Sequence, residues 1–361
     1  MKIFDTMAGM GHEQLVMCHD KSTGYRGIIA VHDTTLGPAL GGTRFWQYAS
    51  DEEAITDALR LARGMTYKNA VAGLNLGGGK SVIIGDNRTP NREMLFRAHG
   101  RFVDSLGGRY VTAEDVGTSV ADMDFVHMET DYVAGLAEGS GDPSPVTARG
   151  VFRATQAAAK FRWGSDDLRG RTVAIQGCGN VGFNLARELT AVGAKLVVGD
   201  IDAARVQRVV EATGADVVDA AAIMAQPVDI FAPCALGGIL NDETIPTLRC
   251  EMVVGAANNQ LLEDRHGDML VARGITYAPD YVANAGGVIN VYSELAGWDR
   301  AQSLRKADEI YQTVLNIFEI AKADGVLPHL AADTLAERRI AAVRGMVRTW
   351  PPFPNKYGSD E

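Results

Sequence analysis

Hydrophobic positions in the first third of the chain follow helical and strand spacings in turn. Between Ile55 and Met65, apolar side chains recur at the period of one helix face. Residues 50–53 (SDEE) precede this stripe with the spacing of a capping box, which marks the start of a helix. The apolar runs at residues 81–84 and 109–112 are short and typical of strands. This part of the chain is therefore expected to mix helices with strands.

From residue 171 onwards, short β-rich runs alternate with helical segments. The runs are residues 171–176, 194–200, 215–219, 228–235, 252–259 and 275–280. Such alternation predicts a parallel sheet wrapped by helices. The Gly-, Ser- and Pro-rich stretch 135–145 is the expected linker, and the helical segment from Val288 is expected to pack back on the first part. We therefore predict an α/β protein with one domain of residues 1–136 and 328–361 and a second of residues 137–327.

The composition narrows the classes of function. A formal net charge of −10 over 361 residues argues against binding to nucleic acid or to an anionic membrane surface. The four cysteines, Cys18, Cys178, Cys234 and Cys250, lie far apart, which predicts reduced thiols. No stretch resembles a signal peptide or reaches the length of a membrane span, and no Cys/His cluster indicates a metal site. These features favour a cytoplasmic protein without nucleic-acid, membrane or metal partners.

A glycine-rich hexapeptide marks a candidate dinucleotide site. It consists of Gly177, Cys178, Gly179, Asn180, Val181 and Gly182. A predicted strand precedes it and a predicted helix follows, which is the context of a Rossmann-type NAD-binding domain. Asp200 ends the next strand, where an acid binds the ribose 2′-hydroxyl and disfavours the extra phosphate of NADP, so NAD is the expected cofactor. An ordinary glycine-rich βαβ turn, or a protein that binds NAD without catalysis, remains an alternative.

A second glycine-rich stretch, residues 75–81 (NLGGGKS), resembles the end of a phosphate-binding loop. Leu74 stands where that loop needs a glycine, and the residues that follow predict a strand rather than a helix. The stretch is instead expected to present Lys80 as a catalytic base, with the glycines leaving room for substrate or cofactor. Lys68 lies on the apolar stripe of the preceding helix with Leu61 and Met65, although it could instead reach solvent or the helix C-terminus. Two inward lysines would lower each other's pKa, and a neutral lysine can act as a base.

Residues 112–117 (TAEDVG) supply a candidate acid at the end of a predicted strand. Asp115 either caps the following turn or meets the two lysines and accepts an ammonium group. Such a site would hold three groups next to the nicotinamide: a lysine that binds a carboxylate, a lysine that acts as a base, and an acid that binds an amine. This combination indicates an α-amino acid substrate.

These motifs together resemble the leucine/phenylalanine/valine dehydrogenases of the glutamate dehydrogenase superfamily. The resemblance rests on residues 37–44 (GPALGGTR), 63–70 (RGMTYKNA), 76–83 (LGGGKSVI), 112–118 (TAEDVGT), 144–151 (SPVTARGV), 177–182 (GCGNVG), 232–241 (APCALGGILN), 255–261 (GAANNQL) and 278–291 (APDYVANAGGVINV). It implies an NAD-dependent, homo-oligomeric enzyme, from dimer to octamer, that reversibly deaminates an L-amino acid to a 2-oxo acid and ammonia. It also implies that the first domain binds substrate and mediates oligomerisation.

The resemblance further implies roles for single residues. Lys68 would bind the substrate carboxylate with help from the backbone around Gly41 and Gly42. Lys80 would activate the water that attacks the imine, and Asp115 would bind the amino group and assist proton transfer. Substrate contacts are also implied for Met65 and Asn259. Cofactor contacts are implied for Thr147, Asp200, Ile201, Ala235, Ala257 and Asn284, together with residues 177–182.

The expected side-chain pocket is lined by Leu40, Ala113, Val288 and Val291. Relatives specific for glutamate carry a lysine at the position of Leu40, and an apolar residue there would leave the distal carboxylate unpaired. The pocket resembles the leucine type, which takes branched aliphatic side chains such as leucine, valine and isoleucine. Phenylalanine or another large apolar amino acid is the alternative, because Ala134 stands where leucine-type relatives have threonine and is expected to enlarge the pocket.

A hydroxy-acid dehydrogenase is a different reading of the same NAD site. Such an enzyme would need a histidine base near the nicotinamide. The candidate is His266 in the polar run EDRHGD, which is expected to form a solvated face.

Overall fold

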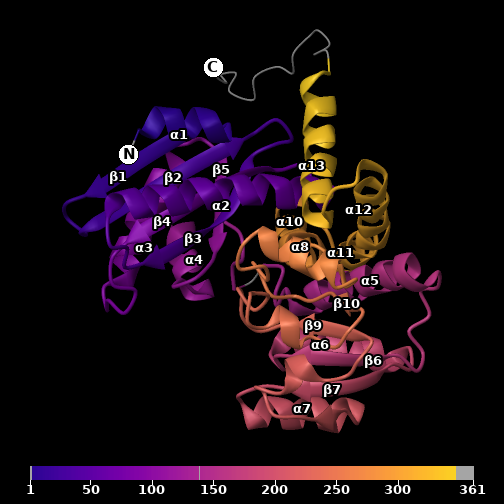
Figure 1. Ribbon diagram of the computed structural model, residues 1–361. Helices are drawn as coiled ribbons and strands as arrows, with labels where there is room; N and C mark the ends of the chain where they lie inside the picture. Colours follow the sequence, from indigo (N-terminus) through magenta and orange to yellow (C-terminus); the bar gives the residue numbers. More distant parts are fainter. Residues whose placement is uncertain (1, 138, 347–361) are drawn as a thin grey trace.

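The computed structural model describes residues 2–137 and 139–346, and these residues form two β-sheets, each covered by helices (Figure 1). The expected α/β class with a Rossmann-type parallel sheet is confirmed. The proposed domain ranges stay a prediction, and the part of the range 328–361 after residue 346 lies outside the described residues. Within the described chain, no helix has both the length and the apolar character needed to cross a bilayer.

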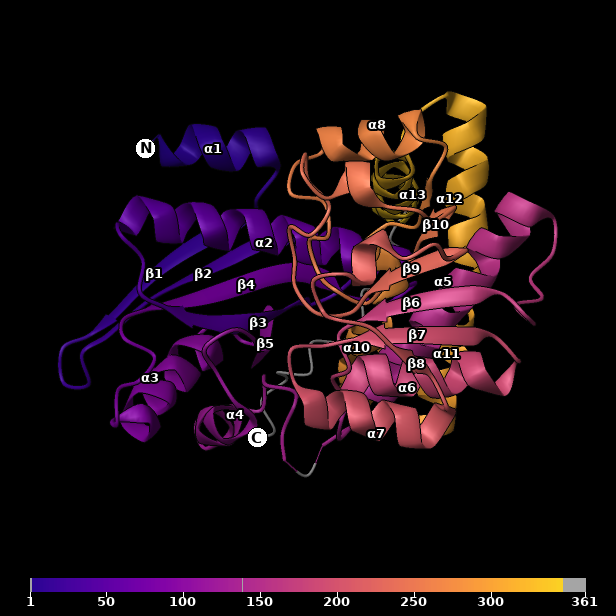
Figure 2. The same cartoon turned by 60° about the horizontal axis from the view of Figure 1, so that its bottom comes forward.

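The first sheet has the strand order β1-β2-β4-β3-β5. Its strands are β1 (Gln14–Asp20), β2 (Tyr25–Asp33), β3 (Ala39–Trp46), β4 (Gly77–Ile84) and β5 (Tyr110–Glu114). β2 runs antiparallel to β1 and β4, whereas β3 runs parallel to β4 and β5. Helices α1 (Ile3–Met10) and α2 (Asp51–Val71) cover one face, and α3 (Arg92–Asp104) and α4 (Val120–His127) cover the other (Figure 2).

Helix α2 begins where the capping spacing predicted it. The Ser50 side chain accepts a hydrogen bond from the Glu53 amide at 3.2 Å. The return bond differs from a capping box, because the Glu53 carboxylate accepts from the amide of Ala49, at 2.7 Å, rather than from Ser50. The cap fixes the start of the helix that carries Lys68 in its last turn.

The three glycines before Lys80 belong to strand β4 and not to a loop. A Cβ at Gly78 would lie 2.5 Å from the carbonyl oxygen of Ala62 in α2, and a Cβ at Gly79 would lie 2.6 Å from the Tyr110 ring. The expectation that these glycines leave room for a ligand is therefore wrong. They let helix α2 and the Tyr110 ring pack directly on the strand.

The second sheet is parallel, with the order β11-β10-β9-β6-β7-β8. Its strands are β6 (Thr172–Gln176), β7 (Lys195–Gly199), β8 (Asp216–Val217), β9 (Ile230–Pro233), β10 (Met252–Val253) and β11 (Thr276–Tyr277). Several are shorter than their apolar runs predicted, because residues 234–238 and 255–259 turn away at the carboxyl ends of the strands. The helices of this half are α5 (Ser144–Trp163), α6 (Asn180–Ala191), α7 (Ala203–Thr213), α8 (Arg265–Ala272) and α9 (Asp280–Ala283), with short 3₁₀ turns η1 (Ile223–Ala225) and η2 (Ile245–Thr247).

The last part of the described chain is helical, as expected. It consists of α10 (Gly286–Ala296), α11 (Arg300–Asp308), α12 (Ile310–Asp324) and α13 (Pro328–Arg344). Helix α13 returns to the first half and packs against α2, whereas α10, α11 and α12 pack against α5 of the second half (Figure 1). The expected return is therefore confirmed for α13 and wrong for the other three. Tyr67 donates a hydrogen bond to Glu337 at 2.8 Å, and Arg339 donates to the carbonyl of Ala70 at 2.9 Å. These bonds hold the C-terminal helix beside the helix that carries Lys68.

Candidate active site

A cavity of about 480 Å³ lies between elements of the two halves of the molecule. It is bounded by β3, β5 and α2 on one side and by residues 258–259, α9 and α10 on the other. The sequence-predicted residues that line it are Leu40, Gly41, Gly42, Met65, Lys68, Lys80, Ala113, Asp115, Asn259, Val288 and Val291. Every residue predicted to contact substrate or to catalyse therefore lies on this one cavity.

Lys80 points its amine at Asp115. The residue lies in β4, its exposed fraction is 5%, and Nζ donates a hydrogen bond to Asp115 Oδ2 at 2.5 Å. Burial lowers the pKa of Lys80, although the Asp115 carboxylate acts in the opposite direction. A lysine with a lowered pKa can lose its proton near neutral pH and serve as a base.

Asp115 follows the last residue of β5, so the strand end sets its position. Burial alone would raise the pKa of this carboxyl, but Lys80 and Arg44 together hold it below its ordinary value. The turn after β5 is closed by Thr118, whose hydroxyl accepts a hydrogen bond from the Asp115 amide at 2.8 Å. Asp115 is therefore an ionised carboxylate able to receive an ammonium group.

Lys68 reaches the cavity from the last turn of α2 and does not turn out to solvent. Its Nζ donates a hydrogen bond to Asn284 Oδ1 at 2.7 Å, across the two halves of the molecule. Burial lowers the pKa of Lys68 to about 8, with a further lowering by Lys80 and an opposing effect of Asp280. The predicted lowering by a second inward lysine is present at Lys68, but burial is the larger cause.

Asn284, which stays a predicted cofactor contact, joins several polar groups next to Lys68. Besides accepting from Lys68, it donates to the Ala256 carbonyl at 3.1 Å and to Asn258 Oδ1 at 2.7 Å. The adjacent Asn259 has a φ of 51°, a left-handed conformation that asparagine tolerates better than most residues. These contacts fix the segment that faces the lysines.

The apolar wall is formed by Leu40, Met65, Ala113, Val288 and Val291. Leu40 is almost fully buried, so a charged group placed against it would lose its water without gaining a partner. Ala134 is also fully buried, but it does not line the cavity. The expectation that Ala134 enlarges the pocket directly is therefore wrong.

Close packing explains the two glycines beside Leu40. A Cβ at Gly41 would overlap the Gly79 carbonyl of β4, and a Cβ at Gly42 would lie 2.8 Å from the Asp115 side chain. The Tyr110 hydroxyl donates to the Gly41 carbonyl at 2.5 Å and holds this backbone in place. The backbone around both glycines thus faces the cavity without a side chain in the way.

The 177–182 loop has the geometry that a dinucleotide pyrophosphate needs. Gly177 has a φ of 99°, and a Cβ at Gly182 would overlap the Gly177 carbonyl. Gly179 caps α6, and a Cβ there would meet no atom within 4 Å, so a phosphate can approach the backbone. The residues present therefore fit a bound dinucleotide.

Asp200 lies beside this loop. Its Oδ2 accepts a hydrogen bond from the Cys178 amide at 2.6 Å, and its Oδ1 accepts from the Asp202 amide at 2.9 Å. Ile201 next to it is 97% exposed. Ala235 packs against Gly177, whereas Thr147 and Ala257 are buried. None of these predicted cofactor residues lines the cavity of the two lysines.

Asp280 and Arg44 are among the charged residues of the cavity that were not predicted individually. Asp280 accepts hydrogen bonds from the amides of Gln260, at 2.9 Å, and Tyr281, at 2.8 Å, and burial raises its pKa. Arg44 lies in β3 and donates to Asp115 Oδ2 at 3.3 Å. Both belong to motifs that carried the family resemblance, and the period-2 spacing of Leu40, Gly42 and Arg44 was the available signal for the arginine.

His266 differs from its predicted environment. The sequence suggested a solvated face, but the side chain is fully buried in α8, one turn before the buried Leu270. Its Nδ1 accepts a hydrogen bond from the Glu263 amide at 2.9 Å. His266 does not line the cavity, so the residues of that cavity do not supply the histidine base of a hydroxy-acid dehydrogenase.

Comparisons with known proteins agree over almost the whole chain. The family described as Glu/Leu/Phe/Val dehydrogenase, dimerisation domain, matches residues 12–132, and Glutamate/Leucine/Phenylalanine/Valine dehydrogenase matches residues 139–204 and 201–345. The leucine dehydrogenase of Thermoactinomyces intermedius is 58% identical over 347 residues, 95% of each chain. The valine dehydrogenase of Streptomyces coelicolor is 53% identical, covering 92% of this chain and 93% of its own. The crystal structure of L-tryptophan dehydrogenase from Nostoc punctiforme superposes with a TM-score of 0.87 at 49% identity, covering 94% of this chain and 99% of that one.

Proposed function

Because the chain belongs to the glutamate/leucine/phenylalanine/valine dehydrogenase family, as its motifs predicted, we propose that it is an NAD-dependent dehydrogenase of branched-chain aliphatic L-amino acids. It converts leucine, and also valine and isoleucine, reversibly to the 2-oxo acid and ammonia. The observation that carries this proposal is the convergence of Lys68, Lys80 and Asp115 on one cavity with an apolar wall.

Binding of the substrate's charged groups follows from the charges of the cavity. The ammonium form of Lys68 pairs with the substrate carboxylate, and backbone groups around Gly41 and Gly42 assist it. The substrate displaces the Lys68–Asn284 hydrogen bond or shares it. Asp115, held as an anion, receives the amino group on the other side of Cα. These two contacts orient the Cα–H bond.

Proton transfer is the task of Lys80 and Asp115. Residues 177–182 and Asp200 would hold NAD, which would supply the acceptor for the hydride from Cα, so that an imine remains on the substrate. Neutral Lys80 then takes a proton from the water that attacks this imine. Lys80 passes this proton to Asp115, 2.5 Å away, which delivers it to the nitrogen that leaves as ammonia. Lys80, neutral again, then takes the hydroxyl proton of the carbinolamine as the 2-oxo acid forms. Asn259 borders this region from the opposite half.

The apolar wall sets the substrate class. Leu40, Val288 and Val291 remove an aliphatic side chain from water and offer no partner to a distal carboxylate, so glutamate is excluded. Single methylene groups change discrimination by only about 1–3 kcal/mol, so several aliphatic amino acids should react.

A large apolar amino acid is the second candidate. The L-tryptophan dehydrogenase noted above is similar over 94% of the chain, and the name of that protein gives an amino acid with a large apolar side chain. Ala113 of the apolar wall favours the branched-chain substrates over this candidate, because phenylalanine-preferring relatives often carry glycine at that position.

The proposal is tested with a panel of 2-oxo acids, ammonia and either NADH or NADPH. We expect the highest kcat/KM with NADH and 4-methyl-2-oxopentanoate, lower values with the oxo acids of valine and isoleucine, and none with 2-oxoglutarate. Highest activity with the oxo acid of phenylalanine or tryptophan would favour the second candidate. Cofactor binding without turnover of any oxo acid would instead indicate an NAD-sensing protein.

NAD preference is assigned to Asp200, whose carboxylate lies at the end of β7 beside the glycine loop. Replacing Asp200 with alanine should lower the NADH/NADPH ratio of kcat/KM by about 10- to 100-fold, since a hydrogen bond to a charged group contributes about 1.5–3 kcal/mol. Asp202→Ala is the matched control, because Asp202 caps α7 and does not contact the loop. An unchanged ratio in Asp200→Ala would place the ribose contact elsewhere.

We further propose that the enzyme acts in the cytoplasm as a homo-oligomer. The description of residues 12–132 as a dimerisation domain in the family supports self-association. No metal has a role in the proposed reaction.

A further inference from the structure

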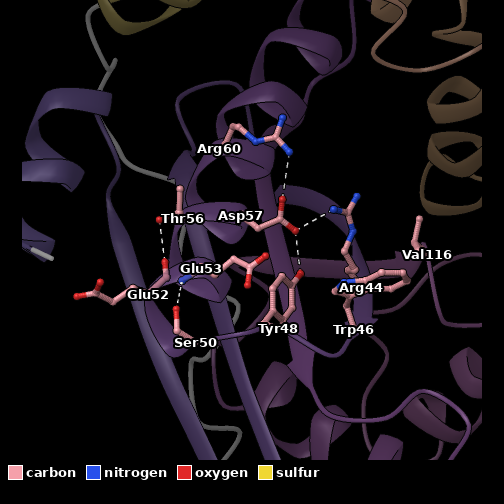
Figure 3. A pocket seen from close by; sticks show the side chains of 10 residues that line it. All are labelled: Arg44, Trp46, Tyr48, Ser50, Glu52, Glu53, Thr56, Asp57, Arg60 and Val116. Atoms are coloured by element: carbon pink, nitrogen blue, oxygen red, sulfur yellow. Dashed lines mark hydrogen bonds and ion pairs between the residues drawn. The ribbon is translucent and has the colours of Figure 1, made fainter. Parts of the chain in front are cut away.

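Arg44 separates the reaction cavity from a second, outer cavity. The outer cavity has a volume of about 710 Å³ and lies beside the start of α2 (Figure 3). Arg44 and Val116 line both cavities. The guanidinium group therefore stands in the wall between the proton-transfer pair and the outer space.

The Asp57 carboxylate holds Arg44 from the outer side, and the Tyr48 hydroxyl in turn holds Asp57. Arg44 Nη1 donates to Asp57 Oδ2 at 2.8 Å, and the Tyr48 hydroxyl donates to the same oxygen at 2.8 Å (Figure 3). Arg60 donates to the other oxygen of Asp57 at 3.1 Å. The Asp57 side chain is only 13% exposed, so this brace is largely shielded from water.

On its inner side, Arg44 meets the proposed catalytic acid. Its Nε donates to Asp115 Oδ2 at 3.3 Å, and this is the oxygen that accepts from Lys80 at 2.5 Å. We propose, on the basis of the function proposed above, that Arg44, braced by Asp57 and Tyr48, is a positioning residue that fixes the Asp115 carboxylate against Lys80. Arg44 acts through Asp115.

The chemistry of the Lys80–Asp115 pair explains why Asp115 needs Arg44 to hold it in place. Asp115 lies in a turn beyond β5, and a lysine is a flexible partner that fixes no plane. The planar guanidinium of Arg44 is held by Asp57 through Nη1, and its Nε–H bond to Oδ2 holds that oxygen of Asp115 against Lys80. A displacement of about 1 Å at a reacting group can lower a rate by about 100-fold.

The charge of Arg44 has a separate effect on Lys80. The charged groups facing Lys80 are Asp57 and Lys68 of α2, Arg44 of β3 and Asp115 beyond β5. Burial lowers the pKa of Lys80 most, the Asp115 carboxylate raises it, and the positive charge of Arg44 lowers it further. Loss of that charge raises the pKa of Lys80, so its neutral form appears only at higher pH.

The test measures kcat and KM for leucine deamination as functions of pH. In Arg44→Gln, we expect kcat to fall by about 10- to 100-fold, more than KM changes, and the acidic limb of kcat/KM to move to higher pH. Arg44→Lys keeps the charge without the planar group, so its kcat should fall while its acidic limb stays close to that of the parent enzyme. Arg60→Gln is the control, because Arg60 also contacts Asp57 but does not reach Asp115, and it should behave like the parent.

Asp57→Asn weakens the brace while keeping Arg44, and it serves if Arg44→Gln does not fold. Asp57→Asn should also lower kcat, by a smaller factor than Arg44→Gln does. Parent-like kcat and pH profile in a folded Arg44→Gln, or in Asp57→Asn if Arg44→Gln does not fold, would overturn the role of Arg44 while leaving the proposed function intact. Absence of amino acid turnover in the parent enzyme would overturn the proposed function, and this inference with it.

Discussion

Replacing Lys80 with alanine is expected to abolish ammonia-dependent oxidation of NADH with 4-methyl-2-oxopentanoate. Loss of a general base lowers a rate by about 100- to 10,000-fold, and the same substitution leaves Asp115 facing the cavity without its closest cation. Binding of NADH should persist, because Lys80 lies in the first sheet and the 177–182 loop follows β6 of the second. The measurements are steady-state turnover and titration of NADH by its fluorescence.

The matched control for this substitution is Lys21→Ala. Lys21 is exposed in the turn between β1 and β2, in the same half of the molecule, and it does not line the reaction cavity. The control should keep parental kcat and KM. Full turnover in Lys80→Ala would remove Lys80 from the mechanism, and loss of both NADH binding and the folded state would show that the lysine acts structurally.

Lys68, Lys80 and Asp115 could be predicted from the sequence because local spacing indicates the position of each residue. Leu61, Met65 and Lys68 follow the helical period, and all three line the cavity from α2. Asp115 comes at the end of a recognisable apolar strand, and the carboxyl ends of parallel strands gather residues at one edge of a sheet. The 177–182 loop could also be predicted from the sequence, because a strand, three glycines, a helix and a second strand follow one another in the expected order.

The remaining features depend on contacts between distant segments. The glycines before Lys80 looked like space for a ligand, and only the packing of α2 and Tyr110 on β4 reveals that protein atoms fill this space. Asp280 influences the pKa of Lys68 from the other half of the molecule, which no local period encodes. The burial of His266 likewise follows from the packing of α8 on its sheet, although the surrounding residues are polar.

A Gly78→Ala substitution is expected to destabilise the protein and to displace the substrate lysine. The added Cβ would overlap the amide nitrogen of Thr66 and lie 2.5 Å from the carbonyl oxygen of Ala62. Both are backbone atoms of α2, so the helix itself must move. Overpacking of a close-packed interior costs about 1–3 kcal/mol and more where backbone must shift. We expect a lower midpoint of urea unfolding and, because Lys68 moves with α2, a higher KM for leucine.

The control is the same substitution where there is room for it. Gly9 lies in helix α1, and a Cβ there would meet no atom within 4 Å. Gly9→Ala should leave KM unchanged and keep or slightly raise the urea midpoint, since alanine favours a helix over glycine by up to about 1 kcal/mol. Each variant adds one methyl group to the parent protein. A difference in urea midpoint or KM between the two therefore measures how closely α2 packs on β4. Equal midpoints and equal KM values would mean that β4 can yield at Gly78, and that Lys68 is positioned by α13 and Asn284 rather than by the glycine strand.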